Sequence, residues 1–389
     1  MVLLLVVAVA AQEDSTRALA EQATADERHL LDAVADVTYL PTQEITRERL
    51  IEEKAEGLLV RSVTHCNQNL LEGTMVRSIA TATAGFDHID RDYCSSHGIL
   101  WRNSPGCNAR SVAHWVMGVL AGRALRLKRP LAQETLAIIG VGHVGSNVQQ
   151  MAEALGIKTL LVDPPRAEQE GGQGFSTLEE AAHEATIITF HTPLTKEGKY
   201  PTYHLLGEDF LHQCRKKPLI LNAARGAIAD SDALLQALNS ERIEGFYLDC
   251  WEGEPNIRLD VLARAERATP HIAGFSADGK ARGTRMAVET TLEHFGLNPS
   301  LIPFDQITLP TPENATIDLS LIGSLRPEWV LAHTMKALSQ IELALRQTPD
   351  QFEFLRVHYN YPREAPAYQL LGVLPEEKQL FRALGYGIA

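Results

Sequence analysis

Three polar residues in the second half of the chain have side chains that could oxidise a hydroxyl group beside a carboxylate. Arg225 and Glu254 each follow an apolar run, and His271 lies further along the chain. A guanidinium can hold a carboxylate bidentately, and a carboxylate beside a histidine orients the ring and stabilises its protonated form. A histidine near a carbinol can take its proton as hydride leaves. A lone histidine among fourteen would more often be structural, but the neighbouring arginine and glutamate favour a 2-hydroxy acid dehydrogenase.

A glycine-rich stretch predicts where the hydride acceptor binds. Gly140, Gly142 and Gly145 form the pattern G-x-G-x-x-G between an apolar run at 136–139 and a helical pattern that starts near Val144. In a strand–turn–helix unit the first glycine permits a tight turn and the second lets a pyrophosphate approach the backbone. The third allows the helix to pack closely on the strand. A purely structural turn is the alternative, but the complete strand–turn–helix–strand context favours dinucleotide binding.

An acidic residue at the end of the next strand indicates which dinucleotide binds. Asp163 ends the apolar run 157–162 and lies about 20 residues after the glycines. A carboxylate there accepts hydrogen bonds from the adenosine ribose and repels a 2′-phosphate, so NAD is favoured over NADP.

Apolar runs alternate with helical stretches along most of the chain, which is typical of a doubly wound parallel sheet. Ligands bind outside the carboxyl ends of such strands. Two N-terminal loops occupy this position, because Arg61 and Ser62 follow the run 58–60 and Thr83 follows the run 79–81. Two ordinary β-to-α turns would look the same.

A proline-rich segment predicts a domain boundary near the C-terminus. Residues 297–312 contain four prolines and interrupt the alternation. The apolar residues beyond it fall on one helical face: Leu331, Met335, Leu338, Ile341 and Leu345. Such a face packs on its own domain or across a dimer interface.

The composition limits the partners and the compartment. A chain of 389 residues with net charge −13 and no Lys/Arg block argues against a nucleic-acid or membrane partner, so an anionic substrate needs a local basic pocket. Five scattered cysteines favour a reducing compartment, with no disulfide framework and no metal site. The apolar run 2–11 has no preceding Lys or Arg, which favours a buried strand over a signal peptide. We therefore expect a cytoplasmic protein.

In these motifs, the chain resembles the D-isomer-specific 2-hydroxyacid dehydrogenase family. The likeness is specific from about residue 57 to 296 and weaker in the C-terminal region. The segments that carry it include 60–64, 81–85, 105–109, 155–161, 251–255, 269–274 and 279–284. One departure is His114, where the family commonly has a glutamate.

The resemblance implies a role for each site residue. Arg225 would bind the substrate carboxylate, His271 would be the acid/base and Glu254 its partner. The implied NAD contacts are Gly140, Gly142, His143, Val144, Gly145, Asp163, Thr192, Ala223, Ala224, Arg225, Asp249 and Gly274. The implied substrate contacts are Arg61, Ser62, Thr83 and Phe275, the last in place of a tyrosine. We further hypothesise that Arg61, Lys280 and Arg282 meet a substrate phosphate.

The resemblance also implies an architecture. We expect an α/β fold with a doubly wound parallel, Rossmann-type NAD domain at 104–272. It would be inserted in a smaller flavodoxin-like substrate domain, 1–103 with 273–298, and followed by an α+β dimerisation domain at 299–389. The expected substrate is a small phosphorylated 2-hydroxy acid, and the expected assembly is a homodimer. A phosphoglycerate, lactate or glyoxylate dehydrogenase of the same family, or an NAD(H)-sensing corepressor, remain alternatives.

Overall fold

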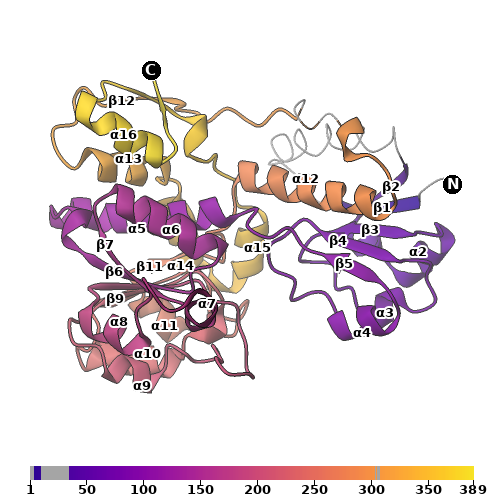
Figure 1. Cartoon of the computed structure of the whole chain (residues 1–389), viewed down its shortest axis with the longest axis horizontal. Coiled ribbons are helices and arrows are strands. Elements are labelled where there is room, and N and C mark those ends of the chain that lie inside the picture. Colours follow the sequence, from indigo (N-terminus) through magenta and orange to yellow (C-terminus); the bar gives the residue numbers. More distant parts are fainter. Residues whose placement is uncertain (1–3, 10–34, 303, 305–306) are drawn as a thin grey trace. The chain divides into compact units, whose positions relative to one another are not determined.

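The computed structural model describes residues 4–9, 35–302, 304 and 307–389 (Figure 1). It divides into two compact units, Met1–Asn108 with Ser276–Thr311, and Ala109–Phe275 with Pro312–Ala389. The chain passes from the first unit to the second after Asn108 and returns after Phe275, at the starts of two long helices. The predicted boundaries, after residues 103 and 272, lie a few residues earlier. The expected separate domain 299–389 is divided: residues 299–311 belong to the first unit, and 312–389 belong to the same unit as 109–275.

The first unit contains a five-stranded parallel sheet with the strand order β2-β1-β3-β4-β5. Its strands are β1 Leu4–Val9, β2 Asp36–Pro41, β3 Gly57–Val60, β4 Ser78–Thr81 and β5 Leu100–Arg102. The order 2-1-3-4-5 is that of flavodoxin-like folds. The predicted N-terminal strand is present as β1, and the rest of the apolar run 2–11 lies outside the described residues.

Helices cover both faces of this sheet. Successive side chains of a strand point to opposite faces, so one apolar strand supplies an apolar cluster on each side. In β3, Leu58 and Val60 pack in one apolar cluster and Leu59 in another, which also contains Val288 of a long helix. That helix is α12 Ala277–His294, and the other cluster receives α2 Arg47–Glu52, α3 Gln68–Leu71 and α4 Arg91–Ser96.

The second unit contains a six-stranded parallel sheet with the order β11-β10-β9-β8-β6-β7. Its strands are β6 Thr135–Ile139, β7 Lys158–Val162, β8 Ile187–Phe190, β9 Leu219–Asn222, β10 Gly245–Leu248 and β11 Arg267–Ala268. The order reverses between β6 and β8, and doubly wound sheets bind their ligands at such a switch point. The predicted doubly wound parallel sheet is confirmed.

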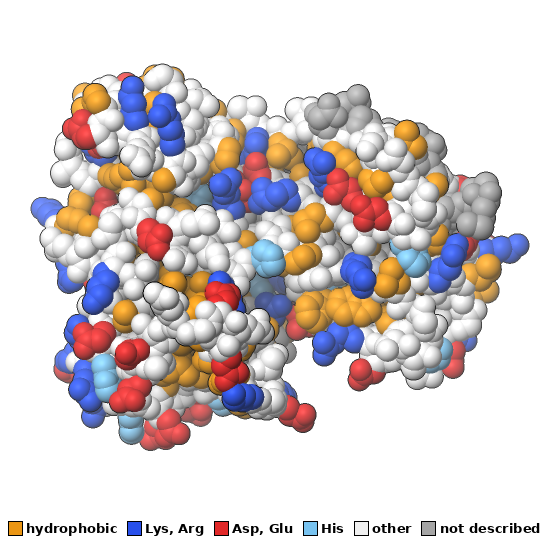
Figure 2. Space-filling view, viewed as in Figure 1, with side chains coloured by type: hydrophobic (Ala, Val, Ile, Leu, Met, Phe, Trp, Pro, Cys, Tyr) orange, Lys and Arg blue, Asp and Glu red, His pale blue; other side chains and the backbone are white. Residues whose placement is uncertain are grey.

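Two layers of helices enclose the six-stranded sheet (Figure 1). One face carries α5 Ala109–Leu127 and α6 His143–Ala154. The other carries α8 Leu178–Glu184, α9 Glu208–His212, α10 Ser231–Asn239 and α11 Leu259–Arg264. On the part of the surface that Figure 2 shows over these last helices, acidic and basic side chains are interspersed.

The C-terminal residues add a three-stranded parallel sheet and four helices to this unit. The strands are β12 Thr316–Asp318, β13 Gln369–Leu371 and β14 Gly387–Ile388, and the helices are α13 Arg326–Thr334, α14 Leu338–Gln347, α15 Phe352–Val357 and α16 Lys378–Ala383. The apolar face predicted as one helix is divided between α13 and α14. The Thr334 hydroxyl donates to the carbonyls of Val330 and Leu331 at the break, and such local hydrogen bonds compete with the helical pattern.

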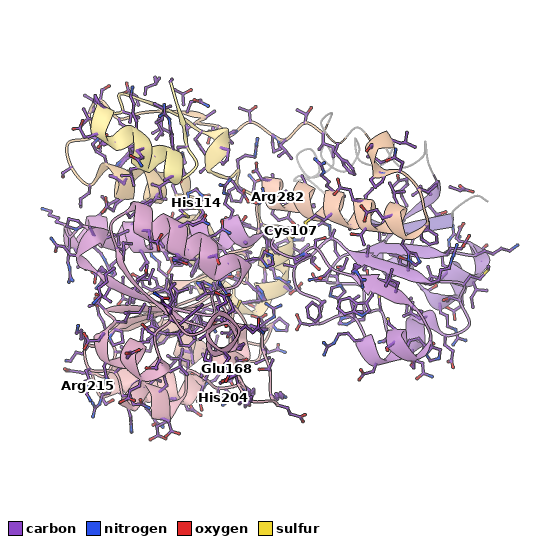
Figure 3. All side chains as sticks on the ribbon, viewed as in Figure 1. Cys107, His114, Glu168, His204, Arg215 and Arg282 are labelled. Atoms are coloured by element: carbon purple, nitrogen blue, oxygen red, sulfur yellow. The ribbon has the colours of Figure 1, made fainter. Side chains whose placement is uncertain are left out.

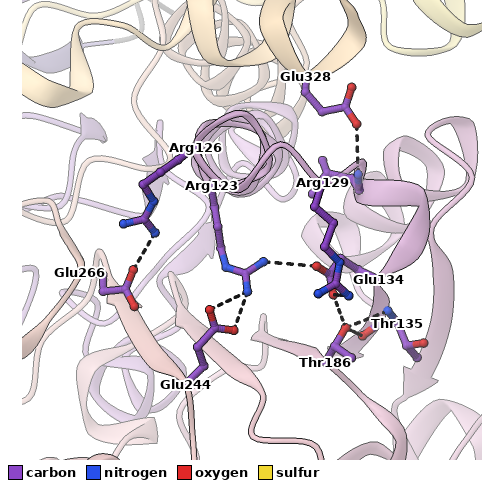
Figure 4. A network of polar contacts seen from close by, with 10 residues as sticks. Arg123, Arg126, Arg129, Glu134, Thr135, Thr186, Glu244, Glu266 and Glu328 are labelled. Atoms are coloured by element: carbon purple, nitrogen blue, oxygen red, sulfur yellow. Dashed lines mark hydrogen bonds and ion pairs between the residues drawn. The ribbon is translucent and has the colours of Figure 1, made fainter. Parts of the chain in front are cut away.

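A network of ion pairs centred on the buried side chains of Arg123 and Glu134 holds the amino ends of the strands (Figure 4). Arg123 of α5 pairs with Glu134 at 3.2 Å and with Glu244 at 2.5 Å, and Glu134 also accepts a hydrogen bond from the Thr186 hydroxyl at 2.6 Å. Glu134 immediately precedes β6, Glu244 precedes β10 and Thr186 precedes β8. The network therefore fixes the edge of the sheet opposite to the one where ligands bind.

Candidate active site

His271 and Glu254 form a hydrogen-bonded pair. His271 Nδ1 lies 2.5 Å from Glu254 Oε1, and both side chains are about a quarter exposed (24% and 27%). The other carboxylate oxygen of Glu254 accepts a hydrogen bond from the Trp251 N–H at 3.0 Å. Burial raises the pKa of Glu254, but the hydrogen bond and charge of His271, the Trp251 amide and the charge of Arg356 together lower it below its usual value. With a proton between Nδ1 and the carboxylate, Nε2 of the neutral ring carries the lone pair that can accept a proton.

A buried carboxylate positions the segment that carries His271. Asp249 is 1% exposed and accepts hydrogen bonds from the Thr269 hydroxyl (2.6 Å) and from the N–H groups of Ile272 (2.8 Å) and Ala273 (2.9 Å). The His271 N–H donates to the Asp249 carbonyl at 2.8 Å. The family resemblance implies that Asp249 contacts NAD, and the structure gives this residue a supporting role for the His271 segment.

Arg225 lies in the loop after β9, next to the loop that contains Glu254. The side-chain amide of Asn222 shapes this loop, because it donates to the Arg225 carbonyl (2.9 Å) and accepts from the Ala224 N–H (3.1 Å). A side chain at Gly226 would overlap the backbone of Trp251, so the two loops are in contact. Since β9, β10 and β11 are neighbouring parallel strands, their loops meet at one edge of the sheet.

The glycine loop has the predicted geometry. Gly140 has φ +90°, and a methyl group there would lie 2.8 Å from the Thr192 methyl carbon and from the His191 carbonyl carbon. A methyl group on Gly145 would overlap the carbonyl oxygen of Gly140, whereas one on Gly142 would have no neighbour within 4 Å. Gly142 thus leaves open space directly before α6, which begins with His143 and Val144.

Two buried polar atoms at the end of β8 also fit a ligand. In the described part of the chain, His191 Nδ1 and Thr192 Oγ1 are buried without a hydrogen-bond partner. Burial lowers the pKa of His191 to about 3, so the ring is neutral. Because such groups are costly to bury unpaired, their position at the switch point between β6 and β8 suits the polar groups of a dinucleotide.

Asp163 lies where the sequence places it, directly after β7. Its carboxylate accepts hydrogen bonds from the N–H groups of Val141 (2.8 Å) and Arg166 (3.1 Å). It therefore supports the glycine loop and caps the amino end of α7 Pro164–Glu170. The sequence had suggested only the ribose contact.

In the first unit, two of the three predicted phosphate-binding residues, Arg61 and Arg282, lie near Cys107. Arg282 Nε donates to the Cys107 carbonyl at 3.0 Å, and Figure 3 shows these two residues together. Arg61 donates to the Thr284 hydroxyl at 2.9 Å and lies 3.5 Å from the Lys280 carbonyl. Burial raises the pKa of the Cys107 thiol, and the charges of Arg61 and Arg282 oppose this shift.

The other predicted substrate contacts lie in both units. Thr83 follows β4, and its hydroxyl bonds to Thr81 and to the Gly85 carbonyl, each at 2.8 Å. Ser62 is exposed in the turn after β3. Phe275 belongs to the second unit, where its ring packs edge-on against Tyr361 with centroids 5.5 Å apart. Sequence reasoning had no signal for this C-terminal aromatic neighbour.

Comparison with known proteins identifies the class of protein. Residues 101–273 match the model of the D-isomer specific 2-hydroxyacid dehydrogenase NAD binding domain. The crystal structure of 3-phosphoglycerate dehydrogenase from Entamoeba histolytica with NAD is similar with a TM-score of 0.62, 26% identity and coverage of 76% of this chain and 96% of that one. D-lactate dehydrogenase from Aquifex aeolicus, with NAD and lactic acid, has a TM-score of 0.59 at 25% identity and covers 75% and 95% of the two chains. The chain belongs to the D-isomer-specific 2-hydroxyacid dehydrogenase family, and it is an NAD-dependent oxidoreductase.

Relatives with higher identity share one name. Erythronate-4-phosphate dehydrogenase of Porphyromonas gingivalis is 47% identical over 360 residues, covering 92% of this chain and 96% of the relative. The enzyme of that name from Bacteroides thetaiotaomicron is 43% identical over 346 residues, with 88% and 95% covered. The corresponding Yersinia pestis protein is 39% identical over 340 residues, with 86% and 89% covered.

Proposed function

We propose that the protein oxidises 4-phospho-D-erythronate to 2-oxo-3-hydroxy-4-phosphobutanoate, a step in the synthesis of pyridoxal 5′-phosphate. The name shared by near-full-length relatives supports this substrate. The observation that carries the chemistry is the 2.5 Å hydrogen bond between His271 and Glu254, at the sheet edge that also bears the glycine loop.

In this reaction His271 is the acid/base. Its Nε2 takes the proton of the C2 hydroxyl, while Glu254 stabilises the imidazolium that forms. Arg225 holds the C1 carboxylate bidentately and stabilises charge on the C2 oxygen. NAD, when bound, accepts the hydride that leaves C2. The residues that would hold it are Gly140, Gly142, His143, Val144, Gly145, Asp163, Thr192, Ala223, Ala224, Arg225, Asp249 and Gly274.

Arg61, Lys280 and Arg282 would meet the substrate phosphate, and the other proposed substrate contacts are Ser62, Thr83 and Phe275. Alanine at each basic position should raise KM for phosphoerythronate. Arg285→Ala is the matched control. Arg285 lies on α12 like Lys280 and Arg282, but its side chain is 57% exposed and pairs with Glu289. Unchanged KM in all three variants would discard the phosphate site.

We propose the roles of the segments accordingly. Residues 1–103 and 273–298 would bind substrate, 104–272 would bind NAD, and 299–389 would form the homodimer. Three exposed leucines near the C-terminal sheet support an interface: Leu321 (95%), Leu371 (38%) and Leu374 (44%). Leu321→Glu should shift the mass measured by light scattering from dimer to monomer, whereas Leu259→Glu, an exposed control outside this region, should not. The five cysteines are free thiols, which supports the cytoplasm as the location.

The deciding experiment measures formation of reduced nicotinamide by the purified protein. The substrates are 4-phospho-D-erythronate, 3-phosphoglycerate, D-lactate and D-glycerate, each with NAD and with NADP, and with a 2-oxo acid added as acceptor. Selective turnover of phosphoerythronate with NAD, lost in His271→Ala, is the expected result. Turnover of another acid would keep the mechanism and change the substrate. Bound NADH without any turnover would favour a sensor.

A further inference from the structure

A row of hydrogen bonds in the first unit leads from the interior to Thr83. His88 Nε2 lies 3.0 Å from the Thr81 hydroxyl, which in turn lies 2.8 Å from the Thr83 hydroxyl. The Thr83 hydroxyl donates to the Gly85 carbonyl at 2.8 Å. Thr81 and His88 are buried, at 0% and 6% exposure, and Thr83 is half-buried. The row therefore ends at one of the proposed substrate contacts.

The Gly85 carbonyl fixes the direction of these hydrogen bonds. A carbonyl oxygen can only accept, whereas a threonine hydroxyl has one proton and two lone pairs. Because Thr83 donates its proton to Gly85, it must accept a hydrogen bond from Thr81. Thr81 has then used its own proton, so it accepts from the Nε2–H of His88. This is the one arrangement in which all three contacts are hydrogen bonds.

His88 is held in the form that this direction requires. Burial lowers the pKa of His88 to about 4, so the ring is neutral at higher pH and carries a single proton, which the row places on Nε2. The backbone of this residue is fixed as well, because its carbonyl accepts a hydrogen bond from the Cys66 N–H at 2.9 Å. The first donor of the row is therefore anchored in the core of the unit.

The row determines what the Thr83 side chain can offer to a ligand. Its oxygen has donated its proton and has filled one lone pair, so it retains one lone pair and no proton. A carboxylate has no proton to donate to it, and neither has a phosphate monoester above its second pKa of about 6. The partner that suits this oxygen is a group that donates a hydrogen bond, such as a hydroxyl.

Thr83 lies beside two of the proposed phosphate ligands. The Ala82 N–H donates at 2.9 Å to the carbonyl of the last residue of β3, directly before Arg61. A methyl group at Gly283 would lie 2.6 Å from the Ala82 carbonyl oxygen, so the loop after β4 packs closely on α12, next to Arg282 (Figure 1). A hydrogen-bond acceptor and two cations thus share the edge of the sheet where ligands of parallel strands bind.

We propose that Thr83 selects substrates that carry a hydroxyl group at C3, because its side-chain oxygen accepts the hydrogen bond of that hydroxyl. The inference rests on the proposed function and deepens it. Phosphoerythronate has hydroxyls at C2 and C3, and in the proposed reaction the C2 hydroxyl gives its proton to His271. The C3 hydroxyl keeps its proton in both substrate and product, and it neighbours the carbon that bears the phosphate. It is therefore the donor that remains for Thr83.

The experiment compares two substrates that differ at C3 alone. They are 4-phospho-D-erythronate and its 3-deoxy analogue, D-2-hydroxy-4-phosphobutanoate, each oxidised with NAD by the full-length protein at about pH 8, where both phosphates are dianions. The value of kcat/KM should be about tenfold higher for phosphoerythronate, as expected for one hydrogen bond to an uncharged acceptor. A general defect of a variant cancels in this ratio, because the two substrates share the carboxylate, the C2 hydroxyl and the phosphate.

Substitutions at Thr83 test whether this side chain causes the preference. Thr83→Val removes the acceptor and should bring the ratio to about one, whereas Thr83→Ser keeps the hydroxyl and should keep the ratio. If valine prevents folding, Thr83→Ala carries the test. Thr74→Val is the matched control, because Thr74 is also half-buried and donates to a carbonyl, that of Leu71 at 2.7 Å, but precedes β4. It should leave the ratio unchanged.

The possible results separate this inference from the proposed function. Equal kcat/KM for the two substrates in the unmodified protein would overturn it, as would the same loss of preference in Thr74→Val. An equal fall in kcat/KM for both substrates in Thr83→Val, with the ratio kept, would mean that Thr83 contacts another group of the substrate and would also overturn it. Absence of phosphoerythronate turnover in the unmodified protein would instead refute the proposed function.

Discussion

His271 and Glu254 are joined by a hydrogen bond although they follow different strands, β11 and β10. The bond exists because Asp249, at the end of β10, holds the backbone of the segment after β11 and so sets the place of the imidazole. Asp249 and Glu254 thus act on His271 from two sides, one through its backbone and one through its ring.

Glu254→Gln should lower kcat for phosphoerythronate oxidation by about 10²-fold, because the amide cannot stabilise the imidazolium that forms when the proton is taken. Steady-state kinetics would measure the loss, and binding of NADH, followed by its fluorescence, should remain. His271→Ala serves as the reference for complete loss. A kcat within about twofold of the unmodified protein would contradict the role of the pair.

The glycine loop predicts a contrast between two alanine substitutions. Gly142→Ala should fold normally and weaken NAD binding about tenfold, since its methyl group meets no protein atom but occupies the approach of the pyrophosphate. Gly145→Ala should lower the free energy of unfolding by about 2 kcal/mol, because its methyl group overlaps the Gly140 carbonyl. Urea unfolding and NAD titration of both variants make the comparison. Normal NAD affinity in Gly142→Ala would contradict the cofactor role of this position.

The ion network at the amino ends of the strands should affect stability alone. Arg123 and Glu134 are 6% and 3% exposed, so Arg123→Met takes from the buried Glu134 carboxylate one of its two cations, leaving Arg129 at 3.2 Å, and should lower the free energy of unfolding by about 2 kcal/mol. Arg126→Met breaks the exposed pair with Glu266 and should cost less than about 1 kcal/mol. KM and kcat measured below the unfolding transition should not change in either variant. Equal destabilisation by the two would refute the difference in burial as the cause.

His114 should make the second unit sensitive to acid. Its Nε2 lies 2.9 Å from the Tyr386 hydroxyl and 3.1 Å from that of Thr334, and burial lowers its pKa from 6.5 to about 4. Below about pH 6.5 the unfolded chain therefore binds a proton that the folded chain does not, and stability falls as the pH drops toward 4. The loss between pH 7 and pH 5 should be about 2 kcal/mol from this group.

Urea unfolding at the two pH values tests this expectation. His114→Gln keeps a polar group near the Nε2 position, and its stability should depend on pH less by about that amount. His212→Gln is the control, because His212 is 63% exposed. A pH dependence that is unchanged in His114→Gln would show that other groups cause the loss.

Local patterns predicted much of the fold and part of the site. The apolar runs at 136–139 and 245–248 form β6 and β10, and the predicted α/β class and the cofactor NAD are confirmed. The spacing of the glycines anticipated the tight turn, the open approach and the close packing that the structure contains. These features could be predicted because each depends on residues that are neighbours in the sequence. The roles of the individual site residues stay predictions.

Other features depend on residues that are distant in the sequence. No pattern indicated that one apolar face would divide into α13 and α14, that His114 would meet Tyr386, or that Arg356 would rest on Phe275. The amino-acid sequence by itself determined the strand–turn–helix units, the NAD motif and the residue types available for catalysis, because backbone geometry and burial of nearby side chains govern those. Only the tertiary structure decided which loops meet at the sheet edge and which C-terminal side chains pack on Phe275, because packing brings together groups whose separation along the chain carries no periodic signal.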